Sequence, residues 1–219
     1  VARLVLQREE QARALVEARA AANELALESL RRRLEPHFLF NALNTLRALI
    51  RTDPFTAREF VADLADLYRY LLHHPDLAEL RDEIEHARAY LTIERARLGG
   101  DRLRIETQLS ESLRSYRVPA LLLQPLVENA VKHGIATRRD GGVIRITAEE
   151  TPEGIVIEVR DRGEGERLGA AQKGSGIAIG ALEQSLSHRY GPAGRLELHV
   201  GDDETVVRVR LPADPRESR

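Results

Sequence analysis

Apolar residues recur at helical intervals along the first part of the chain. The pattern runs from residue 1 to about residue 98, is interrupted by three prolines, and ends at Gly99-Gly100. Near the start the apolar spacing is that of heptads, although Arg8 and Gln11 interrupt it, and it later steps by four residues. Residues 1–29 are therefore expected to form a coiled-coil signalling helix, and the alternative is a linker helix that only dimerises.

The pattern changes after residue 100. Apolar and polar residues alternate in three short runs, which predicts strands, and helical spacing returns in two stretches between them. The strands are expected at 143–147, 155–159 and 206–211, and the helices near 119–133 and 177–189. Strands and helices arranged in this way behind an all-helical segment predict an α+β protein whose second part is an α/β sandwich.

The segment PHFLFNALN at 36–44 combines a broad apolar face with a narrow polar stripe. His37, Asn41 and Asn44 share that stripe, so the His37 imidazole is expected at the surface within reach of the Asn41 amide. Pro36 lacks a backbone donor and predicts a kink just before the histidine. An exposed histidine beside a polar neighbour is a candidate nucleophile for phosphoryl transfer; the alternative is an ordinary surface histidine.

A second amphipathic helix follows the break at Thr52-Asp53-Pro54. Its apolar residues recur at core spacing and are expected to pack back on the first helix as a hairpin. They are Phe60, Leu64, Leu67 and Leu71. Because two helices alone leave apolar surface uncovered, we expect two copies of the chain to form a homodimeric four-helix bundle.

Three polar residues lie beside the apolar stripe of the helix expected near 119–133. They are Asn129, Lys132 and His133. An amide oxygen suits Mg²⁺, and an ammonium and an imidazole suit phosphate oxygens, so this flank is a candidate site for a metal–polyphosphate group. The alternative is three solvated polar residues at a helix end.

Two glycine-containing loops follow. In the first, the Asp161 carboxylate can accept a hydrogen bond from an exocyclic amine, while Gly163 and Gly165 would let the backbone approach a flat ring; a hairpin turn is the alternative. In the second, Gly174 and Gly176 precede a helix N-terminus, where backbone N–H groups favour an anion. Neither loop matches the P-loop pattern.

Composition narrows the classes of function. The 219 residues include 33 Lys and Arg against 35 Asp and Glu, a formal net charge of -2, so no direct nucleic-acid binding is expected. No apolar run approaches the roughly 20 residues that cross a bilayer. The absence of cysteine excludes disulfides, thiolate metal sites and a cysteine nucleophile, and it fits a reducing compartment. Because methionine is absent even at position 1, the chain is expected to be a piece of a longer protein.

The order and spacing of the motifs are more informative than any one of them. PHFLFNALN is followed by LVENAVKHG, then by DRGEG and KGSGI. Together they resemble sensor histidine kinases of the LytS-like class, which carry a GHKL-type (Bergerat) ATP-binding domain. The resemblance extends from about residue 30 to residue 212.

The resemblance implies a role for each motif. His37 would be the phosphoacceptor with Asn41 beside it, Asn129 the Mg²⁺ ligand, and Asp161 the group that recognises the adenine amine of ATP. The other residues expected around the nucleotide are Lys132, His133, Gly163, Gly165, Gly174 and Gly176. The sequence departs from the family pattern at Arg33, Glu35, Ala178, Ile179 and Ala181. Phe38 follows the histidine where many histidine kinases have an acidic residue, so the sequence names no general base, and Glu35 is only a candidate.

The resemblance also implies a domain order. Residues 1–29 would be the signalling helix, 30–98 the dimerisation and histidine phosphotransfer hairpin, 101–212 the GHKL-type catalytic domain, and 213–219 a tail. The glycine pair at 99 and 100 would supply the flexible joint between hairpin and catalytic domain.

The function implied is Mg-ATP-dependent autophosphorylation on His37 and transfer of the phosphoryl group to an aspartate of a response-regulator receiver domain. LytTR-type DNA-binding regulators are the usual recipients in this class, so DNA contact would belong to the partner. The chain would be cytoplasmic, with a membrane reached only through a sensor region outside this sequence. The alternatives are a pseudokinase that serves as a dimeric scaffold and a GHKL ATPase, which Pro125 disfavours because it stands where those enzymes carry a water-activating glutamate.

Overall fold

The structure is a computed structural model that describes residues 36–164 and 176–213. The expected coiled coil at 1–29, the loop glycines Gly165 and Gly174, and most of the tail lie outside these residues. The chain divides into two compact units, Val1–Asn41 and Ala42–Arg219. The second unit therefore contains both the later helices of the helical part and the whole α/β part.

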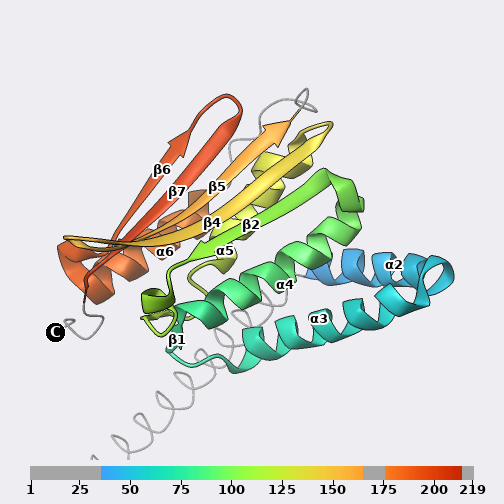
Figure 1. Cartoon of the computed structure of the whole chain (residues 1–219), viewed down its shortest axis with the longest axis horizontal. Helices are drawn as coiled ribbons and strands as arrows, with labels where there is room; N and C mark the ends of the chain where they lie inside the picture. Colours follow the sequence, from blue (N-terminus) through green and yellow to red (C-terminus); the bar gives the residue numbers. More distant parts are fainter. Residues whose placement is uncertain (1–35, 165–175, 214–219) are drawn as a thin grey trace, which may run out of the picture. The chain divides into compact units, whose positions relative to one another are not determined.

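Three long helices open the described part of the chain (Figure 1). They are α2 at Pro36–Thr52, α3 at Pro54–His73 and α4 at Leu80–Leu98. Helix α3 begins where the Asp53 carboxylate accepts a hydrogen bond from the Thr56 N–H at 3.1 Å, with a proline in the first turn. Helix α4 ends at Gly99, whose φ of +95° is a conformation that side chains disfavour.

The apolar row of α3 is buried, and α3 packs against α4. The four residues expected in this row, Phe60, Leu64, Leu67 and Leu71, are all buried. The sequence had placed α3 against α2, and the two helices do line one groove. The packing on α4 was not anticipated: after Pro75 the short strand β1 (Leu77–Glu79) breaks the helical pattern and lets α4 turn back along α3.

The α/β part is built on one five-stranded sheet. Its strands are β2 (Leu103–Leu109), β4 (Gly141–Thr151), β5 (Gly154–Glu164), β6 (Arg195–Val200) and β7 (Glu204–Leu211). They lie in the order β2-β4-β5-β7-β6, with β2 parallel to β4 and the other neighbours antiparallel. A small antiparallel pair joins β1 to β3 (Arg117–Pro119). The three expected strands lie inside β4, β5 and β7, whereas the other four strands were not anticipated.

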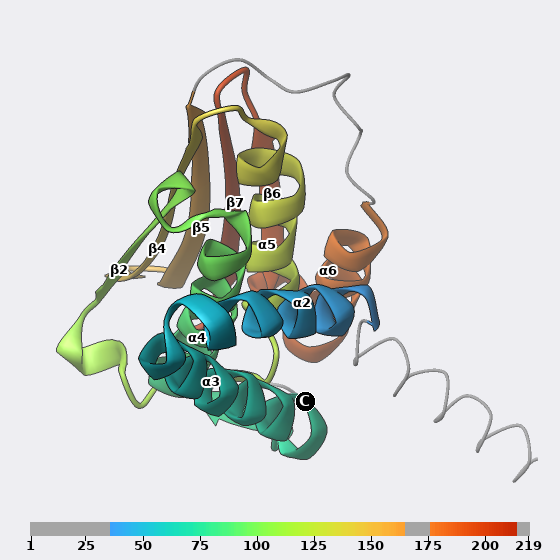
Figure 2. The same ribbon diagram turned by 90° about the vertical axis from the view of Figure 1, so that its right-hand side faces the viewer.

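Helices α5 (Gln124–Asn129) and α6 (Gly176–Tyr190) lie on one side of this sheet (Figure 2). A π-helical turn at Ala130–Gly134 continues α5, and short 3-10 turns occupy Gly100–Arg102, Glu111–Leu113, Ile135–Thr137 and Gly191–Ala193. The core between helices and sheet is aliphatic: it includes Leu126, Val127, Val131, Ile144, Ile146, Ile157 and Val209. The predicted α/β sandwich is therefore present.

The other face of the sheet is charged. Glu158 on β5 accepts hydrogen bonds from Arg160 and from Arg208 on the neighbouring strand, and Arg145 pairs with Glu106 across β4 and β2. Alternation along each strand thus separates an aliphatic face from a face of cross-strand ion pairs. Among the helices in the described ranges, none is long and apolar enough to cross a membrane.

Candidate functional site

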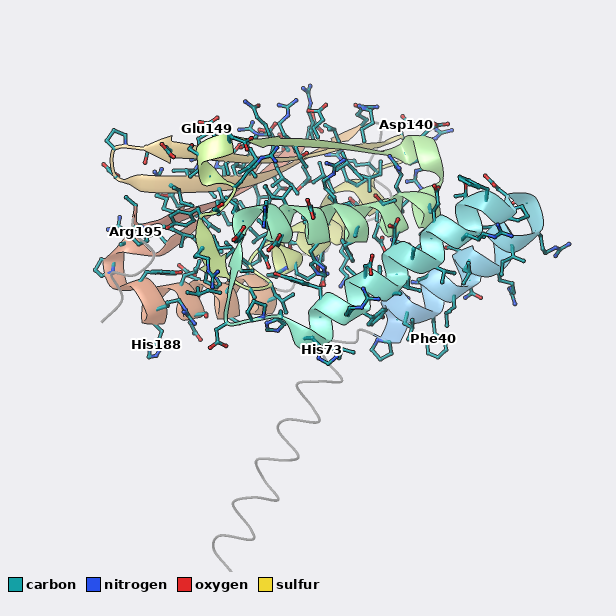
Figure 3. The ribbon with its side chains drawn as sticks, turned by 60° about the horizontal axis from the view of Figure 1, so that its bottom comes forward. Phe40, His73, Asp140, Glu149, His188 and Arg195 are labelled. Atoms are coloured by element: carbon teal, nitrogen blue, oxygen red, sulfur yellow. The ribbon has the colours of Figure 1, made fainter. Side chains whose placement is uncertain are left out.

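His37 is exposed near the start of α2 and has the expected polar neighbour. The Asn41 side-chain nitrogen lies 3.3 Å from Nδ1 and 3.4 Å from Nε2 of the imidazole. The imidazole is therefore within reach of the Asn41 amide, as the sequence predicted, and the nearly equal distances do not distinguish its two nitrogens. Phe40, which is 69% exposed, projects from the same helix (Figure 3).

The asparagine segment forms the end of α5 and the turn after it. Asn129 is the last residue of α5, and the π-helical turn that follows carries Lys132 and His133. Turns of this kind are frequent at functional sites. Asn129 and His133 are half-buried, and Lys132 is exposed. Burial, with a smaller contribution from the Lys132 charge, lowers the pKa of His133 below its ordinary value of 6.5, which favours the neutral imidazole.

A residue that the sequence analysis did not select, Glu128, ties this segment together. Its Oε1 accepts a hydrogen bond from the Gln124 side chain at 2.8 Å, and its Oε2 lies 3.4 Å from the Lys132 ammonium. The spacing of four residues on either side of Glu128 is the signal that could have identified it. Glu128 therefore links the first residue of α5 to the cation beside Asn129.

The turn ends at Gly134, which lies directly against Asp161 on β5. A Cβ atom added at Gly134 would stand 2.1 Å from Oδ1 and 2.5 Å from Cγ of Asp161, so a side chain cannot be accommodated without moving the carboxylate. Asp161 is 4% exposed. This close approach brings the asparagine segment and Asp161 to one place. The sequence had placed Asp161 in a loop after the strand, whereas β5 continues to Glu164 because it stays paired with β4 to its end.

The next position on the same face of β5, Gly163, meets a different side chain. A Cβ atom there would lie 2.4 Å from Cγ and 2.8 Å from Nε of Arg138. The Arg138 guanidinium is held by the backbone oxygen of Asp202 and by the Asp203 carboxylate at 3.0 Å. The sequence suggested that the absence of a side chain at Gly163 leaves room for a bound ring. In the structure Arg138 occupies this space, and nothing near Arg138 in the sequence marks it.

The structure thus gathers part of the predicted set. Asn129, Lys132 and His133 lie on the segment that leads to Gly134 and Asp161, in the Ala42–Arg219 unit. Gly176 is the first residue of α6, a helix that packs against α5. His37 and Asn41 belong to the Val1–Asn41 unit, and Gly165 and Gly174 lie outside the described residues.

The chemistry of this set fits a nucleotide with its metal. A buried carboxylate is suited to accept a hydrogen bond from a base amine, and an exposed ammonium is suited to phosphate oxygens. An amide oxygen can contribute one ligand to Mg²⁺, which usually takes its other ligands from water and phosphates. In the described ranges there is no group of three or more His, Asp or Glu side chains that could hold a metal by itself.

Comparison with known proteins identifies relatives of the chain. The family model described as histidine kinase matches residues 25–103. The sensor histidine kinase BtsS of Escherichia coli K12 is 34% identical over 199 residues, which cover 89% of this chain and 34% of BtsS. The sensor protein LytS of Staphylococcus saprophyticus is 31% identical over 205 residues, which cover 88% of this chain and 34% of LytS. The chain spans about a third of the length of these curated relatives.

The chain is also similar to a solved structure of a histidine kinase. The histidine kinase AdeS of Acinetobacter baumannii is 14% identical, and the match covers 76% of this chain and 83% of AdeS with a TM-score of 0.45.

Replacing Gly134 by alanine tests the close approach. The added methyl group would displace the Asp161 carboxylate, so binding of ADP should weaken by about tenfold or more while the protein still unfolds cooperatively. Isothermal titration measures the affinity, and thermal unfolding checks the fold. The matched control is Gly180→Ala on α6, where an added Cβ atom meets nothing within 4 Å. Equal ADP affinity in both variants would show that the approach does not matter.

Proposed function

Because the chain belongs to the histidine kinase family, we propose that it is the catalytic part of a sensor histidine kinase of a two-component system. The observation that carries the proposal is that one chain holds both an exposed His37 and a buried Asp161 enclosed by the asparagine segment. The first is the residue a kinase of this family would phosphorylate, and the second is suited to hold ATP. The 34% identity to a sensor histidine kinase over 89% of the chain supports the same function.

The nucleotide half of the function rests on residues of the Ala42–Arg219 unit. Asp161 accepts a hydrogen bond from the adenine amine, Lys132 and His133 contact phosphate oxygens, and Asn129 contributes a ligand to the metal. Mg²⁺, when bound, would neutralise the charge that develops between the phosphates. In the proposal, Gly165, Gly174 and Gly176 complete the walls of this site.

The transfer step uses the lone pair of one ring nitrogen of His37. That nitrogen attacks the γ-phosphorus of ATP, a P–N bond forms, and the bond from phosphorus to the bridging oxygen breaks, so ADP leaves with that electron pair. The ring then carries a positive charge until the other ring nitrogen releases its proton. Positioning of the reactants supplies most of the catalysis in such a transfer.

The second transfer passes the phosphoryl group to a response regulator. A carboxylate oxygen of the regulator's aspartate attacks phosphorus, the P–N bond breaks, and its electron pair returns to the ring nitrogen. The other ring nitrogen takes back a proton, so neutral imidazole is the leaving group. The exposure of His37, with the exposed aromatic ring of Phe40 one turn away, supports docking of a receiver domain on this helix. We propose a LytTR-type regulator as the recipient, so any contact with DNA is made by that partner.

We also propose that the helical part assembles as a homodimeric four-helix bundle. Large apolar side chains of α2 and α3 are exposed: Phe40, Leu43, Ile50, Phe55, Val61 and Leu72. An open groove of about 380 Å³ is lined by Leu46, Ile50, Pro54, Ala57, Arg58 and Val61. A second copy of the same helices would cover this apolar surface, as symmetric helix pairing commonly does.

Phosphorylation chemistry tests the proposed function. After incubation with γ-labelled ATP and Mg²⁺, the protein should carry a label that is stable to alkali and lost in acid, as expected for phosphohistidine. His37→Gln should abolish the label and leave ADP affinity unchanged, because His37 contributes nothing to nucleotide binding in this mechanism.

Two results would contradict the proposal. A label that persists in His37→Gln would remove His37 from its role. Absence of any label in the natural sequence, together with measurable ATP binding, would favour the dimeric scaffold without turnover.

The dimer is tested at Val61, which is 47% exposed in the groove. Val61→Lys should weaken self-association by about tenfold or more, because a charge would have to be buried between the copies. Light scattering during size-exclusion chromatography over a range of concentrations measures this. Glu59→Lys places the same side chain on an exposed position of the same helix and should leave the dimer intact. A natural chain that stays monomeric at all concentrations would disprove the bundle.

A further inference from the structure

Glu83, on α4, is a fully buried carboxylate with three hydrogen-bond donors. Its Oε1 accepts from the Tyr70 hydroxyl of α3 at 2.6 Å and from the Leu121 N–H at 2.7 Å, and its Oε2 accepts from the Leu123 N–H at 3.1 Å. The exposed fraction of Glu83 is 0%. One side chain therefore joins a helix of the helical part to the segment that leads into α5.

All three partners donate, so the contacts suit the ionised carboxylate. Burial raises the pKa of Glu83 above its ordinary value of 4.5, and the hydrogen bonds from Tyr70 and the backbone oppose that rise. If a donor is removed, the carboxylate stays buried, and the free-energy cost of its desolvation is no longer offset by that hydrogen bond. The position is therefore sensitive to the loss of any one partner.

The backbone that Glu83 holds is strained. Leu121 has φ of +61°, and within 36–164 and 176–213 it is the only residue other than glycine with a positive φ. A branched side chain disfavours this conformation, which persists only where the surroundings enforce it. The Leu121 N–H points its hydrogen bond at Glu83, so the carboxylate stabilises the strained turn immediately before α5.

The same carboxylate sets the start of α5. The N–H groups at a helix start lack partners within the helix, and Glu83 supplies an acceptor for the Leu123 N–H at this point. Helix α5 then has only six residues, from Gln124 to Asn129. Gln124 at its start also donates to Glu128, the residue directly before Asn129. A shift at the start of so short a helix is carried to Asn129.

We propose that Glu83 is a positioning residue of the nucleotide site. It fixes the start of α5 and thereby the Asn129 amide that ligates Mg²⁺. The hydrogen bond from Tyr70 makes the placement of α5 depend on helix α3. This inference rests on the proposed function, since Asn129 ligates a metal only if the site binds a magnesium nucleotide. Asp161 lies on a different element, β5, so it can still accept its hydrogen bond from the base when the start of α5 moves.

The test compares ADP affinity in Mg²⁺ with ADP affinity in EDTA by isothermal titration. Glu83→Gln keeps the shape of the side chain but replaces one acceptor by a donor, so it should reduce the gain in affinity from Mg²⁺ by about tenfold. Tyr70→Phe removes one donor and should reduce that gain by about threefold. In either variant, affinity in EDTA should fall by a smaller factor than affinity in Mg²⁺, because Asp161 on β5 still binds the base.

Two matched controls separate positioning from general damage. Glu94→Gln removes another buried carboxylate of α4, 3% exposed, whose hydrogen bonds go to Arg97. Tyr190→Phe removes a buried hydroxyl that has no partner among the described residues. Both should keep the full effect of Mg²⁺. In the absence of nucleotide and metal, hydrogen exchange at the Leu121 and Leu123 amides should be faster in Glu83→Gln than in either control variant.

The outcomes are distinguishable. The positioning role is refuted if Glu83→Gln retains the effect of Mg²⁺ as fully as Glu94→Gln, or if it loses ADP affinity equally in Mg²⁺ and in EDTA. Either result leaves the proposed function standing. A natural chain that binds no ADP under either condition refutes the proposed function, and the positioning role falls with it.

Discussion

The close approach of Gly134 to the Asp161 carboxylate is the constraint on which the proposed nucleotide site depends. A helix can meet a buried carboxylate of a strand at this distance only where the helix has no side chain. The π-helical turn at Ala130–Gly134 brings the glycine to that point after the short α5. The segment that carries the asparagine and the cationic residues can therefore end against the carboxylate because Gly134 has no side chain.

A second link joins the helical part of the Ala42–Arg219 unit to this site. The sequence suggested that Gly99-Gly100 separates a hairpin from a catalytic domain. In the structure α4 precedes that pair yet packs against β2 and α5, and its Glu83 holds the backbone before α5. The glycine pair thus lies inside a compact unit, and α4 contributes directly to the region that positions Asn129.

The features that the sequence predicted are those with a local signal. Amphipathic spacing predicted the buried row of α3, and alternation predicted parts of β4, β5 and β7. The carboxylate after the predicted run 155–159 pointed to Asp161, which lies within the longer strand β5. The strands that were missed are short or largely exposed; β6, for example, is an edge strand with little burial. Alternation carries little information where neither face of a strand is covered.

Other features depend on partners that are far apart in the chain. Glu83 looks like any acidic residue of an amphipathic helix until Tyr70, Leu121 and Leu123 surround it. Arg138 likewise has no distinguishing feature in the sequence, because its contact with Gly163 forms only when the end of β5 folds against it. A single sequence gives the chemistry of such residues but not their neighbours.

The central claim is that the buried Asp161 carboxylate accepts a hydrogen bond from the adenine amine. The most direct test compares the affinity of the chain for ADP with its affinity for inosine diphosphate, which carries a carbonyl oxygen in place of that amine. The account predicts that the natural chain binds ADP at least about tenfold more tightly, because the carboxylate would otherwise face an acceptor. It also predicts that Asp161→Asn loses this preference. Equal affinity of the natural chain for the two nucleotides would contradict the account.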